Sequence, residues 1–174
     1  MLAYSAYDAC VRTYGHVKLN GSAVWQASWC GEFLAIRGVT IILVDPISCT
    51  IRESRNFDTY GSSTDATELS NYLKLVEGGS VIVGVTADEP AKKLYNALSA
   101  LQDLGVDVSD VRRRGSFAFV AQKGHPSKTL IYKVLTEEES HRAPAHLTVI
   151  VAGMCTITIN VFLLHCSMTT AIRM

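Results

Sequence analysis

The most regular pattern in the chain is a set of short apolar runs separated by polar turns. Residues 39–44 and 81–85 are apolar and rich in β-branched side chains, which is typical of strands that are buried on both faces. A turn at 46–48 leads into residues 50–57, a more polar run that also has the composition of a strand. Because the connection is short, we expect 50–57 to pair antiparallel with 39–44 and to expose one face to solvent.

Two segments have the apolar spacing of three to four residues that indicates amphipathic helices. The first follows the breaker cluster 61–64, carries acidic residues in its first turn and ends at Gly78. The second is expected to open at 86–90, where proline is tolerated in an early helical position, and to stop at Gly105 in a left-handed cap. The buried stripe of this second helix comprises Leu94, Leu98, Leu101 and Leu104.

Two further strands are predicted at 117–120 and 130–135, around the loop 123–126. The resulting order is β-β-α-β-α-β-β, with local hairpins at both ends. This order favours a mixed α+β domain over a doubly wound sheet. Residues 137–146 then form a polar linker before an apolar tail over 147–174.

The apolar tail has two interpretations. Between Leu147 and Ile172 there is no Lys, Arg, Asp or Glu, and about 20 apolar residues suffice to span a bilayer as a helix. Polar side chains interrupt the run, however, and 149–151 and 156–159 have the β-branched composition of strands. The tail is therefore either a final strand or a membrane anchor. In the second case the chain would contact a membrane through residues 147–172.

Overall charge argues against a nucleic-acid partner. The chain has 174 residues, enough for one domain with its own core, and its 16 basic residues are balanced by 16 acidic ones. The local exception is the run Arg112-Arg113-Arg114, where three cations repel one another unless an anion or a carboxylate lies nearby. The run is either a solvated turn before a strand or part of a site with such a partner.

The cysteines do not indicate a metal site. They are scattered, without a CxxC pair or the Cys/His spacing of a zinc site, at Cys10, Cys30, Cys49, Cys155 and Cys166. Disulfides and buried free thiols are both compatible with this pattern.

Two features bear on the secretory pathway. Asn20-Gly21-Ser22 is a glycosylation sequon, which predicts a glycan on Asn20 if the chain enters that pathway. The first eight residues lack the basic and apolar regions of a signal peptide, as expected for a fragment of a longer chain.

The usual sequence signatures of catalysis do not occur in the chain: there is no GxGxxG, P-loop, GxSxG or HExxH motif. We therefore expect no catalytic residues and no cofactor. Acidic residues do follow two predicted strands, Asp58 after 50–57 and the pair Asp88-Glu89 after 81–85. They could cap loops or line a pocket. As an acid–base pair, Asp58 and Asp88 would need a separation of about 5 to 9.5 Å.

Two arginines stand just before predicted strands, Arg37 before 39–44 and Arg114 before 117–120. If those strands are neighbours, both guanidinium groups reach the same edge of the sheet as Asp88. An Arg–Asp–Arg arrangement could orient sugar hydroxyls or carboxylates through bidentate hydrogen bonds. The alternative is an ion-pair network with a purely structural role.

Several segments together resemble the ILEI/PANDER domain family of interleukin-like secreted proteins, from about residue 37 to residue 124. The order and spacing of the segments carry the resemblance, because no single segment is specific. The family also occurs in the stem of a glycosyltransferase and in cell-surface hyaluronan-related proteins. The matching segments are Arg37-Gly38-Val39, Val44-Asp45-Pro46, Phe57-Asp58-Thr59-Tyr60-Gly61, Val81 to Val85 with Asp88-Glu89, Leu104-Gly105, and Arg114 to Val120 with Lys123-Gly124.

The resemblance implies an α+β fold of two antiparallel β-sheets packed as a sandwich, with short flanking helices, a polar cavity and no enzymatic activity. In this family the cavity has been linked to carbohydrate binding in the glycosyltransferase-stem branch, and the interleukin-like branch consists of secreted signals. Arg37, Asp88 and Arg114 match the family's charged cavity motifs, and Asp58 with Tyr60 matches its Phe-Asp-Thr loop.

One residue departs from the family pattern: Pro90 stands where a glycine usually follows the Asp-Glu pair, and it stiffens this loop. The domain boundaries that we predict are an N-terminal extension over 1–15 and an ILEI/PANDER-like domain over 16–136, followed by the linker and the tail.

The expected function is that of a non-catalytic extracellular module that binds carbohydrate, and the alternative is a secreted cytokine-like ligand for a protein receptor. The partner is thus a glycan or a cell-surface receptor, and the sequence gives no oligomeric state. The expected location is outside the cell or in the lumen of the secretory pathway, as a single-pass membrane protein if the tail is an anchor. The expected ligand-binding residues are Arg37, Asp58, Tyr60, Asp88, Glu89 and Arg114.

Overall fold

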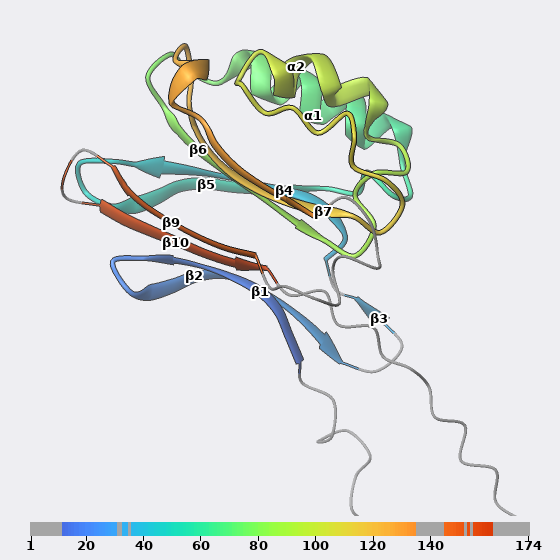
Figure 1. The fold of residues 1–174 in the computed structure, drawn as a ribbon, viewed down its shortest axis with the longest axis horizontal. Coiled ribbons are helices and arrows are strands. Elements are labelled where there is room, and N and C mark those ends of the chain that lie inside the picture. The colour runs from blue at the N-terminus through green and yellow to red at the C-terminus, as the bar shows by residue number, and fades with distance from the viewer. Residues whose placement is uncertain are drawn as a thin grey trace, which may run out of the picture.

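The computed structural model of the chain describes residues 12–30, 33–34, 36–134, 145–151, 153 and 155–161. These residues form two five-stranded antiparallel sheets and two short α-helices. In Figure 1 the helices cover one face of the upper sheet, and the second sheet packs against its other face. The expected α+β sandwich with short flanking helices is therefore confirmed.

The helix-covered sheet has the strand order β5-β4-β6-β7-β8. Along the chain its elements follow one another as the sequence predicts, because a hairpin, a helix, a strand, a second helical segment and a final hairpin occur in that order. The bounds are β4 Gly38–Asp45, β5 Thr50–Phe57, α1 Ser63–Leu75, β6 Val81–Ala87, η1 Leu94–Ala97, α2 Leu98–Gln102, β7 Ser116–Gln122, η2 Pro126–Lys128 and β8 Leu130–Val134.

The second sheet has the order β3-β2-β1-β10-β9. Its strands come from both ends of the described chain, and β10 pairs antiparallel with β1 through partners such as Val17 and Ile159. The bounds are β1 Arg12–Leu19, β2 Ser22–Cys30, β3 Phe33–Leu34, β9 Ala145–Val151 and β10 Cys155–Val161. Part of the predicted apolar tail thus lies in β9 and β10, whereas 162–174 and most of the predicted linker lie outside the described residues. No helix in the described part of the chain is long and apolar enough to cross a bilayer.

Strands β4 and β6 are buried on both faces because they lie between two cores. In β4, Val39 and Ile41 pack with the helices, while Ile42 and Val44 face the second sheet. Every residue of β6 is buried. Burying each large apolar side chain contributes about 1.5–3 kcal/mol, so these two strands hold the layers together.

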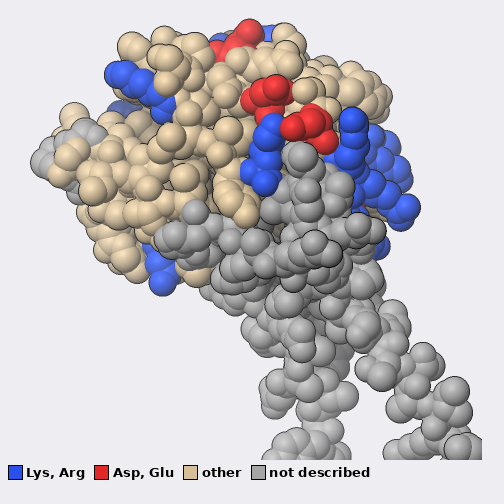
Figure 2. Space-filling model, in the orientation of Figure 1, with Lys and Arg blue, Asp and Glu red and all other residues tan. Residues whose placement is uncertain are grey.

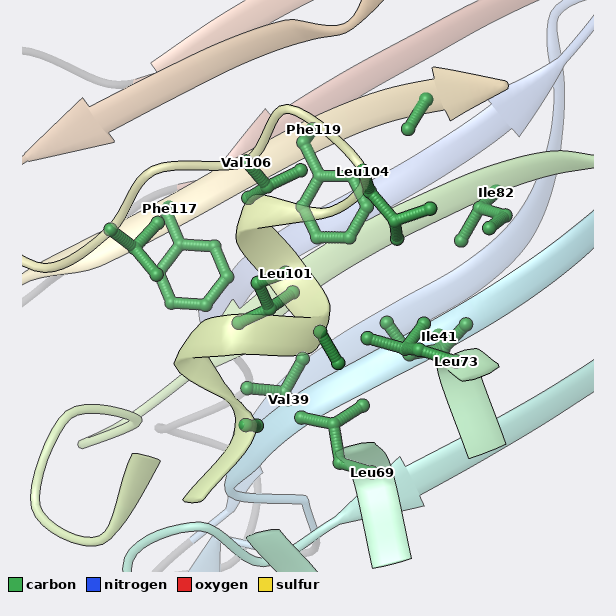
Figure 3. Packing of buried hydrophobic residues seen from close by; sticks show 14 of the residues in the cluster. Val39, Ile41, Leu69, Leu73, Ile82, Leu101, Leu104, Val106, Phe117 and Phe119 are labelled. Atoms are coloured by element: carbon green, nitrogen blue, oxygen red, sulfur yellow. The ribbon is translucent and has the colours of Figure 1, made fainter. Parts of the chain in front are cut away.

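The core beneath the helices contains leucines of α1 and α2 and the phenylalanines of β7. Figure 3 shows Leu101 of α2 beside Phe117, whereas Leu69 and Leu73 of α1 lie close to Val39 and Ile41 of β4. Helix α1 begins where predicted, because the Ser62 hydroxyl accepts a hydrogen bond from the backbone N–H of Asp65 at 3.0 Å.

The second helix starts later than the sequence predicts. Residues 86 and 87 belong to β6, and helical structure begins only at Leu94. Asp88 has a positive φ of 57°, which is incompatible with a right-handed helical turn, and the Glu89 carboxylate accepts the backbone N–H of Ala91. The predicted stop is confirmed, since Gly105 follows the helix with a φ of 81°.

A disulfide joins the two layers of the fold. Cys49, in the turn between β4 and β5, is bonded to Cys155, the first residue of β10, at a sequence separation of 106. The Cys155 side chain is fully buried in the core between the sheets. The sequence left the pairing open, and the pair found here links strands of different layers.

Candidate functional site

The predicted site residues gather at one edge of the helix-covered sheet, where β4 begins and β5 and β6 end. Gly38 pairs with Ala87, so Arg37 and Asp88 lie at the same edge. Val39 pairs with Phe57, which brings Asp58 to that edge as well. The start of β7 lies there too, because the Thr86 hydroxyl donates to the carbonyl of Phe117 at 3.0 Å.

Arg37 makes its direct ion pair with Asp58. The Nε atom of Arg37 donates to the two carboxylate oxygens at 2.9 and 3.0 Å, and Nη2 also donates to Oδ2. Asp58 accepts a further hydrogen bond from the backbone N–H of Gly61 at 2.8 Å. The hydrogen bond from Arg37 lowers the pKa of Asp58, and the same bond raises the pKa of Arg37. The negative charge of Asp88 also raises the pKa of Arg37, and no hydrogen bond between the two side chains is found among the described residues.

Tyr60 lies between this ion pair and a lysine. The guanidinium carbon of Arg37 is 4.9 Å from the centre of the Tyr60 ring, and the Lys92 ammonium nitrogen is 4.3 Å from it. Both distances are typical of cation–π contacts. The Lys93 ammonium also donates to the carbonyl of Gly61 at 2.6 Å. The loop after β5 is therefore held against the loop after β6 from two sides.

Glu89 joins the loop after β6 to the loop before β7. Its side chain is buried, with 3% exposed. One carboxylate oxygen accepts the backbone N–H of Ala91 at 3.1 Å, and the other accepts the backbone N–H of Arg114 at 2.5 Å. Arg114 has a positive φ of 58°, so this bond fixes an uncommon backbone conformation. Because both oxygens bind backbone, Glu89 positions the two loops.

The two loops border a pocket of about 500 Å³. Of the predicted site residues, Tyr60 and Glu89 line it, while Arg37 contacts it through Tyr60 and Arg114 through Glu89. The predicted Arg37–Asp88–Arg114 group does share an edge, but the direct partner of Arg37 is Asp58. The lining residues are Tyr60, Glu89, Ala91, Lys92, Val111, Arg112 and Arg113.

The region that contains this pocket matches a known family. The family described as "Interleukin-like EMT inducer" matches residues 37–125. The chain belongs to this family. All pocket-lining residues, together with Arg37, Asp58, Asp88 and Arg114, lie inside the region that matches the interleukin-like EMT inducer family.

Three curated relatives are similar to half of the chain or more. The human "Cell migration-inducing and hyaluronan-binding protein" is 30% identical over 128 residues, which cover 72% of this chain and 9% of that protein. Zebrafish "Protein FAM3C" is 30% identical over 95 residues, covering 53% of this chain and 41% of the relative. Mouse "Protein FAM3A" is 30% identical over 95 residues, which cover 53% of this chain and 40% of that protein. The chain thus spans less than half the length of each of these relatives.

Sequence reasoning did not include three charged residues that line the pocket: Lys92, Arg112 and Arg113. The arginine run was visible in the sequence, but a solvated turn explains it equally well. Lys92 is one of two adjacent lysines in a segment that was predicted to be helical, and it gave no signal of a site. Figure 2 shows basic side chains close to acidic ones on this face of the molecule, an arrangement that becomes visible only in three dimensions.

The predicted glycosylation residue, Asn20, is exposed in the turn between β1 and β2. Its φ is 47°, and its side-chain oxygen accepts the backbone N–H of Thr156 at 2.8 Å. This hydrogen bond uses the oxygen, whereas a glycan would be attached to the nitrogen. The geometry is compatible with the predicted modification.

Proposed function

We propose that the chain is a non-catalytic extracellular module that binds carbohydrate in the pocket bordered by Tyr60, Glu89 and Lys92. The observation that carries the proposal is the pocket itself, which combines an aromatic ring with several charged side chains. Its volume of about 500 Å³ lies within the ordinary range of ligand sites, about 300–1,000 Å³. A relative is named a hyaluronan-binding protein, which agrees with a glycan ligand.

The chemistry of the carboxylates supports binding over catalysis. Arg37 lowers the pKa of Asp58, so this side chain stays ionised at neutral pH and is unsuited to act as a general acid. Each oxygen of Glu89 accepts a backbone N–H group, so this side chain has a structural role in holding the loops. The remaining role of these acids is to hold the loops and the neighbouring cations in place.

The disulfide supports a location outside the cell or in the lumen of the secretory pathway. Disulfides persist in oxidising compartments and are rare in the cytosol, where thiols are kept reduced. The bond between Cys49 and Cys155 joins the two layers of the fold, so the chain would be markedly weakened in a reducing compartment. A glycan on Asn20 would be consistent with the same route.

A protein receptor is the second candidate partner. The family description refers to an interleukin-like protein, and two large apolar side chains on the helical side of the fold, Leu75 and Tyr95, are 85% and 61% exposed. Exposed apolar side chains of this size can serve as contacts for another protein. In that case binding would depend on the helical side and would be independent of the pocket.

A glycan array with the full-length chain, produced through a secretory route, tests the proposal. We expect selective binding that Tyr60→Ala abolishes, because this change opens the wall of the pocket and frees Lys92. Tyr95→Ala is the matched control, since it removes an exposed tyrosine that does not line the pocket. Loss in the Tyr60 variant alone supports a carbohydrate site. Absence of binding by all three proteins would refute it in favour of a receptor, and loss only in the Tyr95 variant would refute the pocket as the carbohydrate site.

A further inference from the structure

Three of the residues that line the pocket are cations, and they come from two separate loops. Lys92 lies in the loop after β6, and Arg112 and Arg113 lie in the loop before β7. All three are classed as exposed. A ligand in the pocket would therefore meet positive charge from two sides.

Within the part of the chain that the structure describes, these three cations lack the acidic partner that four other basic residues have. Arg37, Arg52, Arg55 and Lys133 each form an ion pair with a carboxylate. Within the described residues, the side chains of Lys92, Arg112 and Arg113 form no such pair, and the one polar contact of Lys92 is with the Tyr60 ring. Their charge is thus left for a ligand or for solvent.

The carboxylate of Glu89, which lines the pocket, is engaged by the backbone. Glu89 is 3% exposed, and both of its oxygens bind backbone N–H groups. Its buried charge is therefore poorly placed to form close pairs with the exposed heads of the cations. The pocket presents three positive groups to solvent beside a single buried carboxylate.

The backbone that carries the cations is held in place before any ligand arrives. Glu89 ties the two loops together through the backbone of Ala91 and Arg114. The arginine turn is closed by a hydrogen bond from the N–H of Gly115 to the carbonyl of Arg112 at 2.9 Å, and it follows Val111, which is buried in the helical core. Such preorganisation lowers the entropy cost of binding.

We propose that the pocket binds the acidic group of a negatively charged saccharide, a carboxylate or a sulfate, with Lys92, Arg112 and Arg113 as its cationic contacts. This inference rests on the proposed carbohydrate function. Adjacent arginines repel each other, and an anion between them removes that repulsion and accepts bidentate hydrogen bonds. The volume of about 500 Å³ leaves room for the sugar ring that carries the acidic group.

The test compares three immobilised hexasaccharides with the full-length chain: unsulfated hyaluronan, the same compound with its carboxyl groups reduced to alcohols, and a sulfated heparin-type oligosaccharide. We expect one or both of the acidic compounds to bind tighter than the carboxyl-reduced compound by about tenfold or more. One charge-assisted contact accounts for about that factor. Binding of the acidic compound should also weaken at about 0.5 M salt, because exposed charges are screened.

The variant for this test replaces Lys92, Arg112 and Arg113 with glutamine. It should lower the affinity for the acidic compound by about 100-fold or more, while binding of neutral glycans stays unchanged. Its melting temperature, measured beside that of the parent, reports whether the fold is intact.

The matched control makes the same change in charge elsewhere, through Arg52→Gln, Arg55→Gln and Lys74→Gln. These residues lie on β5 and at the end of α1 and do not line the pocket. The control should bind the acidic compound within about twofold of the parent. An equal loss in both variants would mean that net charge alone attracts the ligand, which overturns the inference.

The outcomes separate this inference from the function on which it rests. Preference for hyaluronan identifies a carboxylate as the bound group, and preference for the heparin-type compound identifies a sulfate. Either preference supports the inference if the pocket variant no longer shows it. Equal binding of native and reduced hyaluronan, with no effect of the variant, would overturn the inference and leave a neutral-glycan site. Failure to bind any saccharide, including those of the array, would overturn both.

Discussion

The disulfide between Cys49 and Cys155 is expected to supply a large part of the stability of this chain. It ties the turn after β4 to the start of β10, and the two positions are 106 residues apart. In the chain-entropy description, a closed loop of about that length destabilises the unfolded state by ~4.8 kcal/mol at 25 °C. Single domains are stable by only about 5–15 kcal/mol, so reduction should bring the chain close to unfolding.

Urea unfolding of the full-length chain, oxidised and reduced, measures this contribution. Reduction keeps both sulfur atoms in the core, so the comparison isolates the covalent link. The free energy of unfolding should fall by about 4–5 kcal/mol, and its dependence on urea should steepen because the reduced unfolded chain exposes more surface. In a Cys49→Ala/Cys155→Ala control, any remaining effect of reductant belongs to other thiols. A fall below about 1 kcal/mol with an unchanged slope would refute the reasoning.

Three further outcomes can be checked with single substitutions. Phe119→Ala should lower the free energy of unfolding in urea by about 3–5 kcal/mol because Phe119 is fully buried, whereas Leu75→Ala, at a site 85% exposed, should change it by less than about 0.5 kcal/mol. The lowered pKa of Asp58 contributes stability that is present above its unfolded pKa of about 3.9 and is lost as the pH falls through the lower folded value. Asp58→Asn should therefore flatten the acid limb of a stability–pH curve, and an unchanged limb would contradict the Arg37 pairing. Secretory expression of Asn20→Gln should remove one glycan mass from the intact protein, as should Ser22→Ala, which keeps Asn20 and removes only the sequon.

The helix-covered sheet was predictable because its signals are local. Strands such as β4 and β6 are apolar at consecutive positions, since each lies between two cores. Short connections then define the hairpins, and the Ser62 cap defines the start of α1. Each of these features depends on residues within a few positions of one another.

Features that depend on distant residues were not predictable. The second helix starts late because Glu89 binds the backbone of Arg114, which lies 25 residues further along the chain. The final strands pair with β1 across most of the chain, as in the register of Lys18 with Thr158. Composition alone could not distinguish these strands from a membrane anchor, because an apolar run with hydroxyl residues fits both.

The site shows the same limit. The sequence placed Arg37, Asp88 and Arg114 at one edge on the condition that strands 39–44 and 117–120 are neighbours. In the structure β6 lies between those strands, and the pairing of Gly38 with Ala87 brings Arg37 and Asp88 to one edge. The sequence did not indicate that Asp58 would take the direct contact with Arg37, because that choice depends on how the loop 58–61 folds back. Lys92 had no distinguishing pattern, since its position over the Tyr60 ring is a tertiary contact.

The division of the fold between two sheets suggests how such a site can vary among related chains. Among the described residues, those that line the pocket lie between 60 and 113, on loops that leave β5 and β6 or precede β7. The ends of β6 and β7 that carry these loops are buried, and the second sheet supports them through the core between the layers. Because exposed loops on rigid strands tolerate substitution, Lys92, Arg112 and Arg113 can be exchanged without altering the core. Under the proposed function, charge at these three positions is therefore the feature most directly coupled to the ligand and least coupled to the fold.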